Sequence, residues 1–196
     1  MREMIKMIVV LTILTSFSGG LLAAIRNGTK DRIETQQLTF VKGPAIKAIL
    51  EGASNNPIDD RFKIDDQGIE RNFFIGVFDG KADSVAFESA GKGFGGDIGT
   101  MVGVKISDDR IIGVGVTTHS ETPGVGSKAK SDPSFVAQFK DKQMADTFQV
   151  KSDGGQVDAL AGATVTSRGV SVAVTEAGAI YQRLKPQIVE NLKAFK

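Results

Sequence analysis

The segment VDALAGATVTSRGV (157–170), near the C-terminus, has the residue types of a site for an anion. The small residues Ala161, Gly162 and Ala163 leave the Thr164 hydroxyl uncrowded. A long helix is expected directly after this segment, and the free N–H groups at a helix N-terminus favour a phosphate. The pattern therefore places a hydroxyl within reach of a phosphate.

Three polar residues extend this pattern. Thr166 and Ser167 are residue types that cap the first turn of a helix. Asp158, six residues before the threonine, is a candidate for orienting an incoming hydroxyl or a metal ion. From the residues alone, two interpretations stay equally open: a phosphate site with a hydroxyl in reach, and an ordinary capped helix start.

A second segment, THSETPGVGSKA (118–129), follows an expected strand and contains the only histidine of the chain. Its Pro123-Gly124 pair and Gly126 predict a rigid loop with few side chains. Such a loop can present backbone N–H groups and the Thr122 hydroxyl to a ligand, and a structural turn is the alternative. We assign no acid–base role to the histidine.

A third segment, GKGFGG (91–96), has the glycine spacing of a dinucleotide-binding loop. Such a loop must open a helix, whereas here the strand-like DIGTMVGVKI follows it. The context therefore favours a glycine-rich turn between strands. A loop that lets a planar ligand approach the backbone closely is the alternative.

The composition excludes several kinds of chemistry. The chain has no cysteine and one histidine, which excludes disulfides, thiolate metal sites, a cysteine nucleophile and a two-histidine metal site. Its 24 basic and 23 acidic residues leave a net charge of +1, without the basic excess that nucleic-acid binding needs. Redox chemistry would therefore have to be carried by a bound organic cofactor.

The N-terminal part of the chain differs from the rest. The stretch from Met7 to Ile25 carries no charge, and as a helix it would span roughly 28 Å, close to the thickness of a bilayer core. A cleaved signal peptide and a buried core helix are the alternatives, although residues 22–24 make a poor cleavage site. We expect a membrane anchor over residues 1–28 and a folded domain over 29–196. Because few residues precede the apolar stretch, a cytoplasmic N-terminus is the economical choice, with the domain outside the cytoplasm.

The remaining pattern predicts an α+β domain with a mostly antiparallel sheet. Residues 29–53 look helical, with a break at Gly43-Pro44. Turn signals at Asp79-Gly80 and at 107–109 separate β-rich runs into hairpins. These runs are 72–78, 84–89, 100–106 and 110–118.

Two helices are expected after the strands. A short one is expected from Asp132 to Asp141, starting at Asp132-Pro133, and a long one over the last 30 residues. Pro186 is expected to kink or split the long helix near Lys185. Its apolar face comprises Val170, Val174, Ala177, Tyr181, Leu184 and Ile188. The acidic pairs Asp59-Asp60, Asp65-Asp66 and Asp108-Asp109 are interpreted as solvated turns.

Taken together, the anchor, HSETPGVG and the motif from Asp158 to Thr164 resemble a known family over nearly the whole chain. The sequence is similar to the flavin-binding G subunit of the Rnf ion-translocating electron-transport complex and to the related C subunit of the sodium-translocating NADH:quinone reductase. Two residues depart from the family pattern. Ala161 stands where a serine or threonine is usual, and Val125 replaces a leucine. The short length resembles the Rnf subunit more closely.

The resemblance implies a cofactor and a set of residues around it. It implies FMN joined through its phosphate to the hydroxyl of Thr164, as a phosphoester. The remaining residues expected at the cofactor are Glu121, Thr122, Pro123, Gly124 and Gly126 in the loop, and Asp158, Gly162, Ala163, Thr166 and Ser167 around the motif. No catalytic residue and no metal site of the chain itself is expected.

The resemblance also implies a role and partners. The chain would be an electron-transfer subunit of an ion-translocating oxidoreductase complex. A membrane-tethered flavoprotein that serves a different redox partner is the alternative. Other membrane subunits, a separate flavin transferase and membrane lipid are the implied partners. The implied location is the bacterial inner membrane, crossed once, with the domain on the periplasmic side.

Overall fold

The computed structural model describes residues 1–195 of the chain. Contacts within the chain divide it into two compact units, Met1–Leu38 and the chain from Thr39 onward. The first unit is almost entirely the helix α1 (Arg2–Gln36), whose segment Arg2–Lys30 is long and apolar enough to cross a membrane. This helix is the expected anchor candidate, and its length and composition are what support that interpretation.

The chain continues as a single turn of π-helix, η1 (Gln37–Lys42), followed by α2 (Gly43–Ile49). The expected break at Gly43-Pro44 is therefore a change of helix type, with the proline in the first turn of α2. The helix ends before residue 53, at Ile49.

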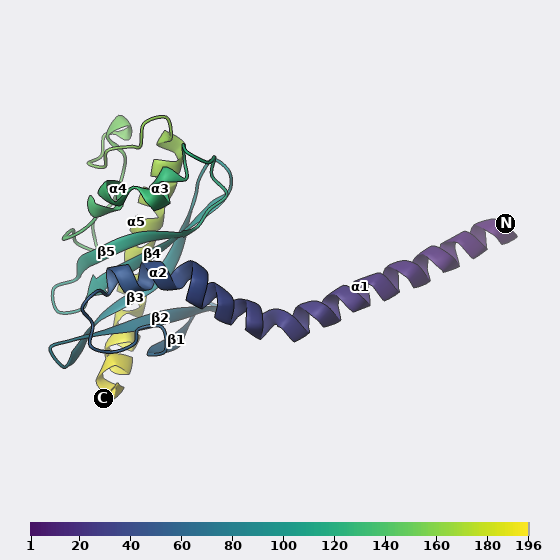
Figure 1. Ribbon diagram of the computed structural model, residues 1–196, viewed down its shortest axis with the longest axis horizontal. Coiled ribbons are helices and arrows are strands. Elements are labelled where there is room, and N and C mark those ends of the chain that lie inside the picture. The colour runs from purple at the N-terminus through teal and green to yellow at the C-terminus, as the bar shows by residue number, and fades with distance from the viewer. Residues whose placement is uncertain (196) are drawn as a thin grey trace. The chain divides into compact units, whose positions relative to one another are not determined.

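The second unit is built on one five-stranded antiparallel sheet with strands in chain order, which confirms the predicted α+β class (Figure 1). The strands are β1 (Arg61–Asp66), β2 (Ile69–Phe78), β3 (Lys81–Lys92), β4 (Asp97–Lys105) and β5 (Arg110–Thr118). The turns at Asp79-Gly80 and at 107–109 lie where they were predicted. Strand β1 was not predicted as a separate run.

After the sheet come α3 (Lys128–Ser131), α4 (Pro133–Ala137), η2 (Lys151–Asp153) and the long helix α5 (Thr164–Ala194). The short helix expected at Asp132-Pro133 is α4. The Asp132 side chain caps it by accepting a hydrogen bond from the N–H of Ser134 at 2.9 Å. Helix α4 lies within the expected span and is shorter than it.

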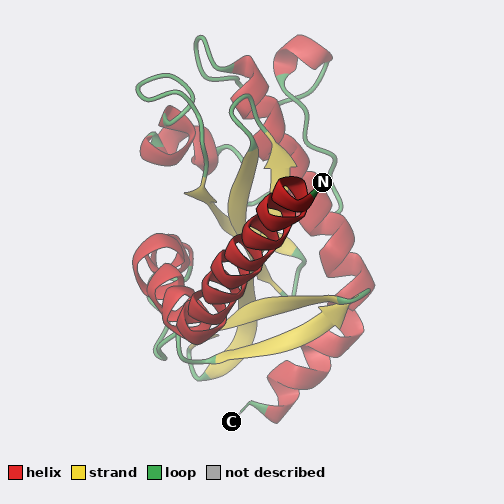
Figure 2. Cartoon of the chain, turned by 90° about the vertical axis from the view of Figure 1, so that its right-hand side faces the viewer, coloured by secondary structure: helices red, strands yellow, loops and turns green. Residues whose placement is uncertain are grey.

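Helices α2 and α5 cover opposite faces of the sheet (Figure 2). Val102 and Val104 of β4 belong to the core under α5, whereas a Cβ at Gly103 would lie 2.2 Å from the Ile49 side chain of α2. Alternate residues of a strand point to opposite faces, so the glycine makes room for α2 while its neighbours pack on α5.

Pro186 does not split the long helix, which runs unbroken from Thr164 to Ala194. A proline inside a helix removes one backbone hydrogen bond. Ile188 and Leu192, after the proline, are nevertheless buried in the core. Burial of these two side chains stabilises the last turns and offsets the lost hydrogen bond.

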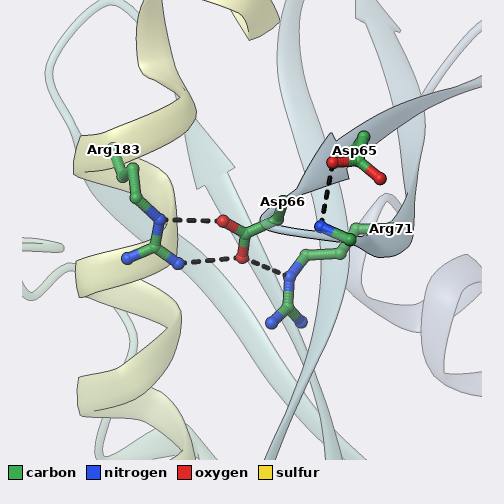
Figure 3. Close-up of polar contacts among 5 residues, drawn as sticks. Asp65, Asp66, Arg71 and Arg183 are labelled. Atoms are coloured by element: carbon green, nitrogen blue, oxygen red, sulfur yellow. Dashed lines mark hydrogen bonds and ion pairs between the residues drawn. The ribbon is translucent and has the colours of Figure 1, made fainter.

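Asp66 corrects the interpretation of its acidic pair as a solvated turn. The residue ends β1, is only 3% exposed, and forms ion pairs with Arg71 of β2 and Arg183 of α5 (Figure 3). Its carboxylate accepts two hydrogen bonds from Arg183, both at 2.8 Å, and one from Arg71 at 2.7 Å. The hydrogen bonds from Arg183 outweigh burial and lower the pKa of Asp66 to about 2. This network fastens α5 to the β1–β2 hairpin.

Asp109 is a second correction of the same kind. Its carboxylate accepts a hydrogen bond from the Tyr181 hydroxyl at 2.5 Å and two from Lys185 Nζ at 2.6 Å. Burial opposes ionisation, but the hydrogen bonds from Lys185 and Tyr181 hold the pKa of Asp109 below its usual range. The turn between β4 and β5 is thus fastened to the second half of α5.

Candidate functional site

A cavity of about 380 Å³ brings together the three segments that the sequence singled out. The elements that carry these segments, the β3–β4 turn, the loop after β5 and the start of α5, lie at the same end of the sheet (Figure 1). Its lining residues are Phe94, Glu121, Thr122, Val125, Gly126, Gly162, Ala163, Thr164, Val165 and Thr166.

The first turn of α5 forms one wall of this cavity. Gly162 adopts a left-handed backbone conformation (φ +76°), which turns the chain into the helix, and Thr164 is the first helical residue. The residue before the helix, Ala163, has no side chain that can cap it, and the first turn contains no acidic residue. The N–H groups of this turn are therefore left for a ligand or water. The half-buried hydroxyl of Thr164 lies beside them.

The sequence predicted Thr166 and Ser167 as caps of the helix. Neither residue caps it, because both lie inside α5. The Ser167 hydroxyl accepts a hydrogen bond from the N–H of Leu160 and donates one to the carbonyl of Ala163, each at 3.0 Å. Ser167 thus fixes the turn that carries Thr164 onto the helix. The Thr166 hydroxyl instead donates to the carboxylate of Glu121.

The loop after β5 forms the opposite wall. Gly124 has a positive φ of +73°, and its N–H donates to the Ser127 hydroxyl at 2.8 Å. The carbonyl of Thr122 accepts from the N–H groups of Val125 and Ser127. The loop is therefore the compact turn predicted from its proline and glycines. Pro123 and Gly124 shape this turn without lining the cavity, whereas Thr122 and Gly126 line it.

The β3–β4 turn (residues 93–96) contributes a residue that sequence reasoning missed. Phe94 lines the cavity with its side chain 76% exposed, and Val165 on the facing helix is also exposed. Together with Val125, which also lines the cavity and is exposed, they form a cluster of apolar side chains, and such clusters are typical of ligand-binding grooves. The signal in the sequence was a phenylalanine between two turn glycines.

The glycines of residues 91–96 allow close packing between protein segments. A Cβ at Gly91 would lie 2.0 Å from the carbonyl oxygen of Gly169 in α5, and one at Gly95 would lie 2.0 Å from that of Ser120. The sequence predicted a turn between strands here, and residues 93–96 form it. These close approaches bring the turn, the loop and α5 together at one cavity.

Asp158 does not line the cavity. Its exposed carboxylate forms an ion pair with Lys151 at 2.7 Å, and its backbone is held by Gln138. Ser167 likewise lies behind the wall. Of the eleven residues expected at a cofactor, Asp158, Ser167, Pro123 and Gly124 are outside the lining, and the other seven are part of it.

A larger, open hollow of about 810 Å³ lies at the C-terminal end of α2. Its rim carries charges of both signs, including Glu51, Asp79, Lys81, Lys105 and Lys140. It contains none of the three segments, so the smaller cavity is the candidate site.

Comparisons with known proteins agree with this choice. Residues 93–179 match the family model of the FMN-binding domain, a span that begins in the β3–β4 turn and includes both walls of the cavity. In the solved structures, the chain is similar to NqrC of Shewanella oneidensis, with a TM-score of 0.53 and 29% identity. That match covers 73% of this chain and 72% of the other.

Curated relatives extend the likeness to most of the chain. The G subunit of the ion-translocating oxidoreductase complex of Pseudomonas aeruginosa is 33% identical over 90% of this chain and 87% of its own length. The protein of the same name from Methanosarcina acetivorans is 32% identical over 90% and 93%, and that from Vibrio atlanticus 32% over 86% and 85%. The resemblance inferred from the motifs is confirmed, and the chain belongs to the family of G subunits of ion-translocating oxidoreductase complexes.

Proposed function

We propose that this protein carries FMN bound covalently through a phosphoester to Thr164 and serves as an electron-transfer subunit of a membrane-bound ion-translocating oxidoreductase complex. The observation that carries the proposal is the half-buried Thr164 hydroxyl at the uncapped start of α5, inside a cavity of the FMN-binding domain. When bound, the flavin supplies the electron-accepting ring that no side chain of this protein provides.

The residues at the cavity fit the phosphate end of FMN. A phosphoester keeps negative charge on its free oxygens, and α5 directs the positive end of its dipole and its unpaired N–H groups at the place where that charge would lie. Gly162 and Ala163 put no bulky side chain beside the hydroxyl.

The residues also fit the ring end. Phe94, Val125 and Val165 give the cavity an exposed apolar rim, and burying it against a flat ring would remove apolar surface from water. Thr122 and the backbone of Gly126 offer polar groups beside that rim. We therefore assign ring or ribityl contacts to these five residues, with Pro123 and Gly124 holding the loop in shape.

The covalent bond gives the cofactor a fixed place in a chain of carriers. Joining the phosphate of FMN to the Thr164 oxygen, formally with loss of water, leaves the ring chemically unmodified. A tethered flavin can neither diffuse away nor wait for rebinding between electron transfers. We assign the attachment step to a separate flavin transferase, with Asp158 on the exposed surface as a contact for it.

The experiment that tests the attachment is in-gel fluorescence of the denatured protein, because only a covalent flavin survives denaturation. Wild type should fluoresce, and Thr164→Ala should fold and carry no fluorescence. The matched control is Thr122→Ala, which removes another hydroxyl of the same cavity and should keep the flavin. Fluorescence that persists in Thr164→Ala would disprove the acceptor.

The membrane topology is a separate part of the proposal. We infer that α1 crosses the bilayer once, since Arg2–Lys30 is long and apolar enough to span it, and we propose that the domain lies on the periplasmic side. Fusing alkaline phosphatase after Lys196 should give an active enzyme, because that reporter works only outside the cytoplasm. An inactive phosphatase together with an active cytoplasmic reporter at the same position would reverse the orientation.

The partnership in a complex has its own measurement. The subunits of such a complex should be recovered with the tagged, detergent-solubilised protein, and reduction of its flavin should require them. Recovery of the protein alone, with a flavin reduced by an unrelated donor, would favour a stand-alone membrane-tethered flavoprotein.

A further inference from the structure

Glu121 places a buried carboxyl group in the lining of the cavity. The residue is 6% exposed, although the four residues that follow it, Thr122 to Val125, are exposed. Within the described residues 1–195, no lysine, arginine or histidine forms an ion pair with it. A buried carboxylate without a counter-ion is costly unless hydrogen bonds stabilise it. Its hydrogen-bond partners therefore matter.

Each oxygen of this carboxylate accepts a hydrogen bond from a different segment. Oε1 accepts from the backbone N–H of Gly95 in the β3–β4 turn at 2.8 Å. Oε2 accepts from the hydroxyl of Thr166 in the first turn of α5. Glu121 itself belongs to the loop after β5. One side chain thus joins the three segments that line the cavity.

The glycines around the carboxylate show how closely these segments approach it. A Cβ at Gly93 would lie 2.5 Å from Oε1, and a Cβ at Gly126 would lie 2.8 Å from Oε2 and 2.7 Å from the Thr166 hydroxyl. Neither position has room for a larger residue. The backbone at Gly93 and the backbone at Gly126 therefore enclose the Glu121 carboxylate on two sides.

We propose that Glu121 is the positioning residue of the cavity. Its carboxylate sets the spacing of Phe94, the Thr122–Gly126 loop and the Thr164 turn, and it acts on the flavin through these neighbours. The consequence for the flavin rests on the proposed function. The hydrogen bonds of Glu121 to Gly95 and Thr166 are a property of the protein alone.

This role predicts which substitutions are tolerated. In Glu121→Gln the amide oxygen can accept from Gly95, and the amide nitrogen can donate to the Thr166 oxygen, so both links persist without the charge. Glu121→Ala leaves the N–H of Gly95 and the hydroxyl of Thr166 buried without their partner. Thr166→Val preserves shape and removes one link. Ser120→Ala, next to Glu121 and exposed, is the matched control.

The test measures backbone hydrogen exchange in the full-length protein in detergent, in a Thr164→Ala background so that no attached flavin contributes. Exchange in the peptide that contains Gly95 should rise roughly tenfold or more in Glu121→Ala, because a hydrogen bond to a charged group is lost. Exchange should rise less in Thr166→Val, and in Glu121→Gln and Ser120→Ala it should stay at the rate of the Thr164→Ala parent protein. Unchanged exchange in Glu121→Ala would overturn the proposal.

The consequence for the cofactor is measured in the same variants with Thr164 intact. The fluorescence anisotropy of the attached flavin should fall in Glu121→Ala and Thr166→Val and be retained in Glu121→Gln. A midpoint potential moved equally by glutamine and alanine, with unchanged anisotropy, would assign Glu121 an electrostatic role and overturn the proposal. If Glu121→Ala fails to fold, the comparison of Thr166→Val with Glu121→Gln decides, and equal exchange in these two overturns it.

Failure of this proposal differs from failure of the proposed function. A wild-type protein without covalent flavin would disprove the attachment, and the exchange measurement would still test the positioning role of Glu121. Normal flavin attachment together with unchanged Gly95 exchange in Glu121→Ala would disprove only the positioning role of Glu121.

Discussion

The start and the second half of helix α5 are built differently. At its start, the helix has no side-chain cap, and its first turn faces a cavity with exposed apolar residues. In its second half, Arg183 forms an ion pair with buried Asp66, and Tyr181 and Lys185 bind Asp109. The N–H groups of the first turn are thus left open, whereas the charged side chains of Arg183 and Lys185 in the second half are bound to partners elsewhere in the protein.

This difference separates binding from stability within one helix. A site that must receive a cofactor keeps unpaired N–H groups and glycine-rich turns, both of which contribute little to folding. Ion pairs and core packing further along the helix supply the rigidity that such a site needs. We therefore expect substitutions in the two regions to have separable effects, on flavin binding at the start of α5 and on the free energy of unfolding in its second half.

The largest effect on stability is expected from Asp66→Ala. Removing the buried carboxylate leaves Arg71 and Arg183 without their shared partner, and we expect the free energy of unfolding to fall by about 3 kcal/mol. Flavin per folded molecule should stay unchanged. Urea unfolding measures the free energy of unfolding, and in-gel fluorescence measures the flavin content. Asp65→Ala is the control, since Asp65 is exposed and accepts one bond from Gly68. If Asp66→Ala folds but lacks flavin, the separation is wrong.

Acid should weaken the same network. The pKa of Asp66 is lowered from 3.8 to about 2 by its arginine partners. A carboxyl with a depressed pKa contributes stability that is fully present above its unfolded pKa and is lost as the pH falls from about 4 to about 2. The loss should be about 2 kcal/mol, and urea unfolding at stepwise lower pH measures it. Asp66→Ala should lack this part of the pH dependence, so parallel curves for the two proteins would refute the assignment.

A smaller effect is expected from Tyr181→Phe. Burial, and then the hydrogen bond to Asp109, raise the pKa of Tyr181 far above its usual range, so its hydroxyl stays protonated and donates. Phenylalanine keeps the packing and removes the hydrogen bond, which should cost about 1 kcal/mol while Lys185 still holds Asp109. Flavin fluorescence should not change. A loss of stability as large as that of Asp66→Ala would mean that the networks of Asp66 and Asp109 contribute equally to the free energy of unfolding.

The smallest effect on stability, below about 1 kcal/mol, is expected from Pro123→Ala in the loop beside the start of α5. Gly124→Val forces a β-branched residue to a φ of +73°, whereas Pro123→Ala is compatible with the backbone. Flavin should attach in both, and the visible spectrum and midpoint potential should shift more in Gly124→Val. Spectra and potentials identical to wild type in both variants would reduce the loop to a surface turn.

Local sequence patterns predicted the elements whose signals lie within a few residues. Asp79-Gly80 marked a hairpin, and the apolar face of α5 gave its length, because turn chemistry and helical periodicity depend on neighbours in the chain. The two motifs gave the two walls of the cavity for a similar reason. A proline–glycine loop and a small-residue turn before a helix are each recognisable in isolation.

Features that depend on distant partners were not predictable. Asp66 looked like a solvated turn residue because its partner Arg183 lies 117 positions away in sequence. The split of α5 that was one expected effect of Pro186 does not occur, and the burial of Ile188 and Leu192 that stabilises the last turns depends on the sheet beneath them. Thr166 looked like a helix cap because nothing in the sequence brings Glu121 to it.

The central claim is that the open end of α5 holds the cofactor through Thr164. The most direct measurement is mass spectrometry of peptides from the purified wild-type protein after denaturation and proteolysis. The account predicts that the peptide containing Thr164 gains the mass of FMN less one water, and that fragmentation places this gain on Thr164. An unmodified Thr164 peptide at full recovery, or the same mass gain on another residue, would contradict it.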